Sequence, residues 1–133
     1  YDPGRIVAVF GCGGNRSKVR RYDIGEAAGE LADLCILTSD NPRIEKVEDI
    51  NNDIKVGLAK HDAEYIEIID RREAIAYAIT HALPGDMIIL LGKGHETYVE
   101  IEGVKHHFSE HEVVREIAED IRAGRRKMEH ITL

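Results

Sequence analysis

Four short apolar runs recur along the chain, separated by stretches that have the period of a helix. The runs are Ile6–Phe10, Leu34–Leu37, Tyr65–Ile69 and Met87–Leu91. Most of them are nearly unbroken apolar stretches, which is the pattern expected when helices cover both faces of a parallel sheet. The run Tyr65–Ile69 contains Glu67 and is therefore expected at an edge. The pattern predicts a sheet of four strands.

Apolar residues spaced three or four apart between these runs predict three helices, the first two of which turn their apolar side toward the sheet. Asp70 and Glu73 form a capping-box pair at the start of the third helix, and Pro84-Gly85 ends it. The three apolar stripes are Ile24, Ala27, Ala28, Leu31 and Ala32; Val47, Ile50, Ile54 and Leu58; and Ala74, Ile75, Ala78, Ile79 and Ala82.

The segment after the fourth run predicts a β-hairpin and a last helix. Thr97–Ile101 and Val104–Phe108 flank the turn pair Glu102-Gly103. Ser109 with Glu112 three residues on predicts the cap of a helix that carries Val113, Val114, Ile117, Ala118 and Ile121. The order is therefore βαβαβαβ followed by a hairpin and a helix, with right-handed crossovers, and the fold class is an open α/β domain.

Composition and charge narrow the classes of partner. The chain has 133 residues, 18 Lys and Arg against 25 Asp and Glu, and a net charge of −7. A chain of this length forms one core, and its negative charge disfavours nonspecific binding to nucleic acid or to an anionic membrane. No apolar run approaches the roughly 18 residues of a membrane helix. We expect a soluble protein without nucleic-acid or membrane partners.

The ends of the chain and its cysteines indicate its context. The opening Tyr1-Asp2-Pro3-Gly4 has neither an initiator methionine nor an apolar leader, so we expect a piece of a longer, non-secreted protein. Cys12 and Cys35 suit two reduced thiols in the cytoplasm. From about Ala123 the chain turns basic and loses its pattern, which predicts a domain over residues 1–124 and a frayed tail over 125–133.

The loop after the first run is the first candidate for binding chemistry, because ligands of open α/β sheets collect outside the carboxyl ends of the strands. It reads Gly11-Cys12-Gly13-Gly14-Asn15-Arg16-Ser17-Lys18. Its glycines let the backbone approach a ligand, and its cations suit an anion. Arg16 stands where a dinucleotide fingerprint needs glycine, so that motif is not met. A tight glycine turn with solvated cations is the alternative.

The loop after the second run reads Thr38-Ser39-Asp40-Asn41-Pro42-Arg43. Pro42 stiffens a backbone that presents an acid, an amide and a guanidinium together. Arg43 can bind a carboxylate through two parallel hydrogen bonds, and Asp40 can hold an ammonium group. An ordinary turn leading into the second helix is the structural alternative.

The loop after the fourth run reads Gly92-Lys93-Gly94-His95-Glu96. Its two glycines expose backbone carbonyl and amide groups, and Glu96 adds a second acid for an amine. Gly92-Lys93 does not form a Walker A loop, because Gly94 stands where Ser or Thr is needed. His95 by itself is more typical of a structural histidine than of a catalytic one.

Other charged residues give weaker signals. Arg71 and Arg72 follow the third run and could join the rim of the site, although we expect them at a solvated helix start. His106, His107 and His111 lie near acids but lack the spacing of a known zinc site, so we predict no metal there.

Three of the four strand ends therefore predict a site for a small molecule that bears both carboxylate and ammonium groups. The segments Phe10–Arg16, Thr38–Arg43 and Gly92–Glu96, in this order and spacing, resemble the C-terminal domain of Mur ligases, over about Gly4 to Ile121. Within that family, the chain is most similar to the branch that adds meso-diaminopimelate, with which the Asp-Asn-Pro-Arg motif is associated. The resemblance implies a Rossmann-like fold, with an open, mainly parallel sheet and helices on both faces.

The resemblance also implies the activity of a three-domain cytoplasmic ligase of peptidoglycan synthesis. Such a ligase uses ATP and Mg²⁺ to activate UDP-N-acetylmuramoyl-L-Ala-D-Glu as an acyl phosphate, which the amine of meso-diaminopimelate attacks. ATP and Mg²⁺ would be bound mainly by other domains, and the ATP-binding central domain would be a partner within the same polypeptide. This domain alone is expected to be inactive, with no catalytic residue. The family's substrate contacts fall on Arg16, Asp40, Asn41, Arg43, Gly92 and Glu96.

Two other functions stay open at this point. The chain could be a free-standing Rossmann-like module that senses a phosphate or nucleotide through Gly11–Lys18. It could also be a structural domain whose loops only pack against a neighbour.

Overall fold

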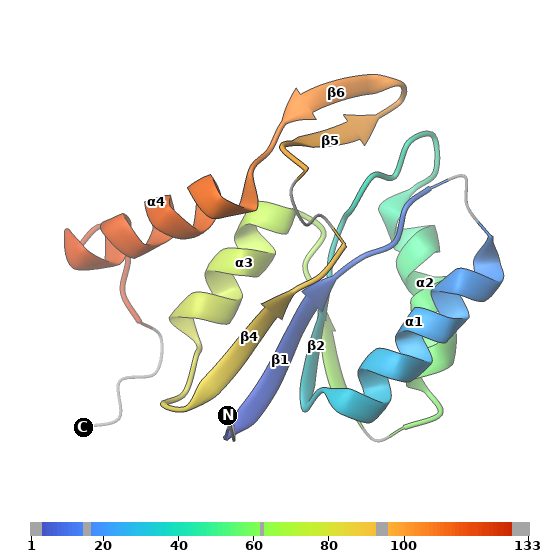
Figure 1. Ribbon diagram of the computed structural model, residues 1–133, viewed down its shortest axis with the longest axis horizontal. Helices are drawn as coiled ribbons and strands as arrows, with labels where there is room; N and C mark the ends of the chain where they lie inside the picture. Colours follow the sequence, from blue (N-terminus) through green and yellow to red (C-terminus); the bar gives the residue numbers. More distant parts are fainter. Residues whose placement is uncertain (1–3, 15–16, 62, 93–95, 129–133) are drawn as a thin grey trace.

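The computed structural model describes residues 4–14, 17–61, 63–92 and 96–128, and it confirms an open α/β architecture (Figure 1). Within these residues, no helix combines the length and the apolar character that a membrane span needs. The elements in chain order are β1 (Arg5–Phe10), α1 (Lys18–Leu31), β2 (Leu34–Leu37), α2 (Val47–Leu58), β3 (Glu64–Glu67), α3 (Arg71–Thr80), β4 (Asp86–Leu90), β5 (Tyr98–Ile101), β6 (Val104–His107) and α4 (Glu110–Arg122).

The main sheet consists of four parallel strands in the order β3-β2-β1-β4. β1 lies inside the sheet and pairs with β2 and β4, with Val7 opposite both Leu34 and Ile88. Residues 7–10 of β1 are buried on both faces of the sheet, which explains the unbroken apolar run. β3 lies at an edge, as Glu67 predicted, and it ends two residues earlier than expected.

Helices cover both faces of the sheet (Figure 1). On one face, α1 and α2 pack over Ala8, Phe10 and Leu37. On the other face, α3 and α4 pack over Val7 and Val9. All four strands run in one direction, so the loops that leave β1, β2 and β4 emerge at the same end of the sheet.

Helix α1 differs from its prediction. Ala28 and Ala32 are buried as expected, but Ala27 is exposed and Leu31 is 72% exposed. The reason is close packing against α2 through glycines, because a Cβ on Gly25 would lie 2.1 Å from the Ile54 carbonyl oxygen. Apart from the buried Arg21, the helix therefore turns glycine and alanine residues, rather than Leu31, toward the interior.

The C-terminal part confirms the predicted hairpin and caps. β5 and β6 pair antiparallel around Glu102 and Gly103, which both have positive φ, as a tight hairpin turn requires. The Asp70 side chain accepts a hydrogen bond from the backbone N–H of Glu73 at the start of α3, and Ser109 caps α4. Of the predicted tail, Arg125 donates to the Asp120 carboxylate at 2.9 Å, and residues 129–133 lie outside the described part.

Candidate functional site

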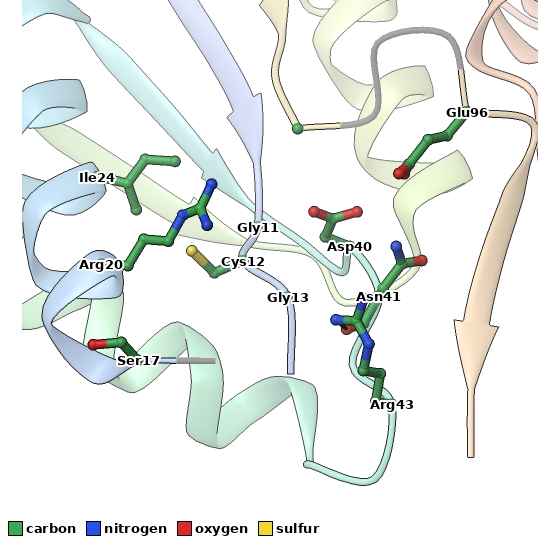
Figure 2. Close-up of a pocket in the computed structure, with 11 residues that line it drawn as sticks. Gly11, Cys12, Gly13, Ser17, Arg20, Ile24, Asp40, Asn41, Arg43 and Glu96 are labelled. Atoms are coloured by element: carbon green, nitrogen blue, oxygen red, sulfur yellow. Dashed lines mark hydrogen bonds between the residues drawn. The ribbon is translucent and has the colours of Figure 1, made fainter. Parts of the chain in front are cut away.

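A cavity of about 260 Å³ lies at the carboxyl ends of β1, β2 and β4 (Figure 2). It brings together five of the six residues that the sequence marked for ligand binding, namely Asp40, Asn41, Arg43, Gly92 and Glu96. The sixth, Arg16, lies outside the described residues, as do Lys93, Gly94 and His95. The cavity is also lined by Gly11, Cys12, Gly13, Ser17, Arg20 and Ile24.

The floor of the cavity is built by close contact between the β1–α1 and β2–α2 loops. The backbone N–H of Gly14 donates to the Asn41 carbonyl at 2.6 Å. A Cβ on Gly14 would lie 1.8 Å from the Pro42 carbonyl oxygen, and one on Gly11 would lie 2.3 Å from that of Thr38. Glycine is therefore required at both positions, because any side chain would force the two loops apart.

Arg43 is held in an unusual backbone conformation at the edge of the cavity. Its φ is 54°, in the left-handed region that non-glycine residues seldom adopt. Its backbone N–H donates to the Glu100 carbonyl at 3.2 Å, and its carbonyl accepts from Glu102 at 2.8 Å. Its Nη1 donates to the Gly14 carbonyl at 3.0 Å, and its Nε lies 3.8 Å from a carboxylate oxygen of Glu100. The loops and the hairpin thus fix the guanidinium together.

Asn41 has a structural role in addition to the predicted one. Its side chain is buried, and its Oδ1 accepts a hydrogen bond of 2.8 Å from the backbone N–H of Glu100 on β5. The amide of Asn41 therefore ties the hairpin to the turn that carries Asp40 and Arg43.

The acidic part of the cavity is formed by Asp40, Gly92 and Glu96. Figure 2 shows the carboxylates of Asp40 and Glu96 pointing into the same space between the end of β2 and the segment before β5. Gly92 has a φ of 102°, and a Cβ on it would lie 3.2 Å from Oδ2 of Asp40. Two carboxylates beside an open backbone suit an ammonium group.

The basic part contains a residue that the sequence did not mark. Arg20 lies in the first turn of α1, three residues after the N-cap Ser17, and both residues line the cavity. The N-terminus of α1 therefore faces the ligand space together with a guanidinium, and both favour an anion such as a carboxylate. The helix start at residue 18 could have pointed to Arg20, because first-turn residues lie beside the preceding loop.

Cys12 lines the cavity but is not suited to act as a nucleophile. Burial raises the pKa of its thiol, and the nearby cation of Arg21 offsets only part of this rise. The thiol is therefore neutral near pH 7, where a nucleophilic cysteine would need to be a thiolate.

Arg71 was predicted at a solvated helix start, and that prediction is wrong. Arg71 is only 2% exposed and hydrogen-bonds to the backbone of two strand ends, whereas Arg72 is partly exposed and pairs with Glu116. His107 lies 2.7 Å from the Glu112 carboxylate. Among the described residues, no group of three or more His, Cys, Asp or Glu is arranged to hold a metal ion.

Comparison with known families identifies the family of the chain. The family described as "Mur ligase, glutamate ligase domain" matches residues 1–94. The chain belongs to the Mur ligase family. The whole parallel sheet lies within this matched region, and each of the three loops that line the cavity begins there.

Curated relatives of this Mur ligase domain carry the name UDP-N-acetylmuramoyl-L-alanyl-D-glutamate--2,6-diaminopimelate ligase. The protein from Caldanaerobacter subterraneus subsp. tengcongensis is 51% identical over 88% of this chain and 24% of its own length. The Aquifex aeolicus protein is 53% identical over 86% of this chain and 23% of its own length. The chain thus spans about a quarter of the length of the curated relatives it matches.

A solved structure supports the same relationship for the fold. A structure of UDP-N-acetylmuramoyl-L-alanyl-D-glutamate--2,6-diaminopimelate ligase superposes with a TM-score of 0.80 and 43% identity, covering 93% of this chain and 25% of that one. The ligand-binding roles of Asp40, Asn41, Arg43, Gly92, Glu96 and Arg16 stay predictions.

Proposed function

We propose that this Mur ligase domain binds meso-diaminopimelate for a ligase that joins it to UDP-N-acetylmuramoyl-L-Ala-D-Glu in peptidoglycan synthesis. The names of the relatives support the reaction. The observation that carries the proposal is one cavity that combines two carboxylates, Asp40 and Glu96, with two guanidinium groups, Arg20 and Arg43. This charge pattern is complementary to a molecule with both ammonium and carboxylate groups.

The far end of the ligand, with its carboxylate and its ammonium group, matches two neighbouring parts of the cavity. Arg43 binds the carboxylate at the far end of the diamino acid, and Asp40 with Glu96 holds the ammonium group beside it. L-Lysine carries that ammonium group but no carboxylate next to it, so lysine would offer Arg43 no ligand carboxylate to bind. Arg43 is therefore the residue that selects meso-diaminopimelate over lysine.

ATP and Mg²⁺ would be bound mainly outside this chain. The sequence lacks a Walker A loop, and the described part of the chain has no metal-binding cluster of three or more His, Cys, Asp or Glu side chains. We assign most of the binding of both groups, and the binding of the UDP-linked substrate, to parts of the ligase outside this chain. The two buried free thiols, Cys12 and Cys35, are consistent with a cytoplasmic enzyme.

A phosphate-sensing or nucleotide-sensing function fits the cavity less well. At about 260 Å³ the cavity is smaller than the roughly 300–1,000 Å³ of pockets for drug-sized ligands. Asp40 and Glu96 would also repel the phosphate groups of a nucleotide. The cavity therefore favours a small zwitterion.

The test is an NMR titration of the ¹⁵N-labelled chain with meso-diaminopimelate, L-lysine and ATP, each to roughly 10 mM so that millimolar binding is seen. We expect meso-diaminopimelate to shift the amides of residues 11–14, 40, 41, 43 and 92, and to bind more tightly than lysine. Arg43→Asn, chosen because asparagine tolerates positive φ, should weaken meso-diaminopimelate binding by roughly 10²-fold and leave lysine binding almost unchanged.

The matched control is Arg125→Asn, which removes a surface arginine distant in sequence from every cavity residue and should change neither affinity. Preference for ATP over meso-diaminopimelate would overturn the proposal and favour the sensor. Retained discrimination between meso-diaminopimelate and lysine in Arg43→Asn would remove Arg43 from its assigned role.

A further inference from the structure

Arg71 connects two strand ends that do not touch each other in the sheet. Its Nη1 donates to the Ser39 carbonyl at 2.8 Å, and its Nη2 donates to the Leu91 carbonyl at 2.8 Å. Ser39 follows β2, and Leu91 follows β4. Because β1 lies between β2 and β4, hydrogen bonds between adjacent strands do not join these two ends directly.

The two carbonyls that Arg71 binds lie one residue before the acidic part of the cavity. Ser39 precedes Asp40, and Leu91 precedes Gly92. β1 ends at Phe10, and beyond that point the planar guanidinium of Arg71 joins the two segments through one hydrogen bond to each. A guanidinium offers donors in a fixed fork, which sets the distance between two acceptors more rigidly than a flexible ammonium group does.

Glu110 supplies the charge that Arg71 needs in a buried position. Its Oε2 accepts from Nη2 of Arg71 at 3.0 Å and from Nε at 3.3 Å, and Glu110 is also buried. Glu110 is the first residue of α4, directly after the cap Ser109. A buried arginine without such a partner is strongly unfavourable, so Glu110 holds Arg71 in the orientation that reaches both carbonyls.

We propose that Arg71, oriented by Glu110, is a positioning residue that sets the distance between Asp40 and Gly92 and so shapes the ammonium-binding part of the cavity. This inference rests on the proposed function for its ligand. Arg71 itself does not line the cavity and acts through the two backbone segments that it joins.

The test compares Arg71→Lys and Glu110→Gln with Arg72→Lys as the matched control. Arg72 is the next residue of α3 and pairs with Glu116 of α4 at 2.6 Å, so it joins the same two helices, but among the described residues it has no recorded bond to a strand end. All affinities are measured by ¹⁵N NMR at a temperature where circular dichroism shows each variant to be folded.

We expect Arg71→Lys to weaken meso-diaminopimelate binding by roughly tenfold, because one charge-assisted hydrogen bond to a strand end is lost. The amides of Asp40 and Gly92 should shift before any ligand is added, which loss of stability alone would not cause. Glu110→Gln keeps an acceptor but removes the charge, so it should shift the same amide signals by less than Arg71→Lys does. In the ligase that carries this domain, KM for the diamino acid should rise while KM for ATP stays constant.

The outcomes separate this inference from the proposed function. If the unsubstituted chain does not bind meso-diaminopimelate, the proposed function fails, whereas displaced Asp40 and Gly92 amides in Arg71→Lys would still support the positioning role. If the unsubstituted chain binds, and Arg71→Lys binds equally well with those amides in place, the positioning role is wrong. Should Arg71→Lys not fold, Glu110→Gln decides by the same two measurements.

Discussion

Replacing Gly14 with alanine tests whether the contact between the β1–α1 and β2–α2 loops holds the cavity together. The new Cβ would lie 1.8 Å from the Pro42 carbonyl oxygen, whereas real Cβ atoms essentially never approach within 3.0 Å of such an atom. The obstructing atom belongs to the backbone of a proline, so it cannot move by a change of rotamer. The two loops must separate.

The size of the effect follows from three contributions to the free energy of unfolding. Overpacking costs about 1–3 kcal/mol. Loss of the 2.6 Å hydrogen bond from Gly14 to Asn41 removes about 1 kcal/mol more. Alanine restricts the unfolded chain, which raises the free energy of unfolding by about 0.4–1 kcal/mol. We expect a net destabilisation of about 1–3.5 kcal/mol.

Urea unfolding followed by circular dichroism measures this difference. Gly4→Ala is the matched control, because a Cβ on Gly4 meets no atom closer than 3.8 Å, and its stability should equal or slightly exceed that of the unsubstituted chain. Gly14→Ala should also weaken meso-diaminopimelate binding, since the Gly14 carbonyl accepts from Nη1 of Arg43. If both alanine variants unfold at the same urea concentration, the two loops are not in the contact described here.

Two further predictions concern buried groups outside the cavity. Burial raises the pKa of Cys35 from its ordinary value of 9.0 to about 11, so the unfolded chain releases this proton first, and stability should fall as the pH rises across that window. This pH-dependent fall in stability should be smaller in Cys35→Ala than in the unsubstituted chain. An equal fall in the urea midpoints of the two proteins would contradict the raised pKa of Cys35. Arg21 is 1% exposed and binds Glu45 and Asp53, so replacing it with alanine should lower the free energy of unfolding by about 3 kcal/mol. The same replacement of the surface residue Arg125 should lower it by at most about 1 kcal/mol. Equal urea midpoints for the two arginine variants would refute this.

The fold was largely predictable because its signals are local. Each strand of the main sheet was marked by an apolar run, and the caps at Asp70 and Ser109 form the hydrogen bonds that their spacing predicted. The error in α1 has a non-local cause. Whether Leu31 faces inward depends on how closely α1 approaches α2, and this is set by Gly57 on the other helix as much as by Gly25.

The cavity was predictable in part for a topological reason. Parallel strands bring the loops after them to one edge, so Asp40, Arg43 and Glu96 had to lie near one another once the strands were recognised. The environments of Arg21 and Arg71 could not be predicted in this way. An arginine at a helix start is usually solvated, and the acid that makes burial possible for Arg71 lies 39 residues further along the chain.

The backbone of Arg43 is held by elements beyond the loop that carries it, so the proposed selectivity would depend on them as well. A left-handed backbone at a non-glycine residue costs on the order of 1–3 kcal/mol and persists only where surrounding contacts enforce it. Here two backbone hydrogen bonds to the β5–β6 hairpin enforce it, and the Asn41 side chain fixes the hairpin to the same turn. The residue proposed to distinguish meso-diaminopimelate from lysine is therefore oriented by a hairpin nearly 60 residues later in the chain. The Asp-Asn-Pro-Arg sequence is therefore not the only determinant of that orientation, because hydrogen bonds to Glu100 and Glu102 also hold the Arg43 backbone.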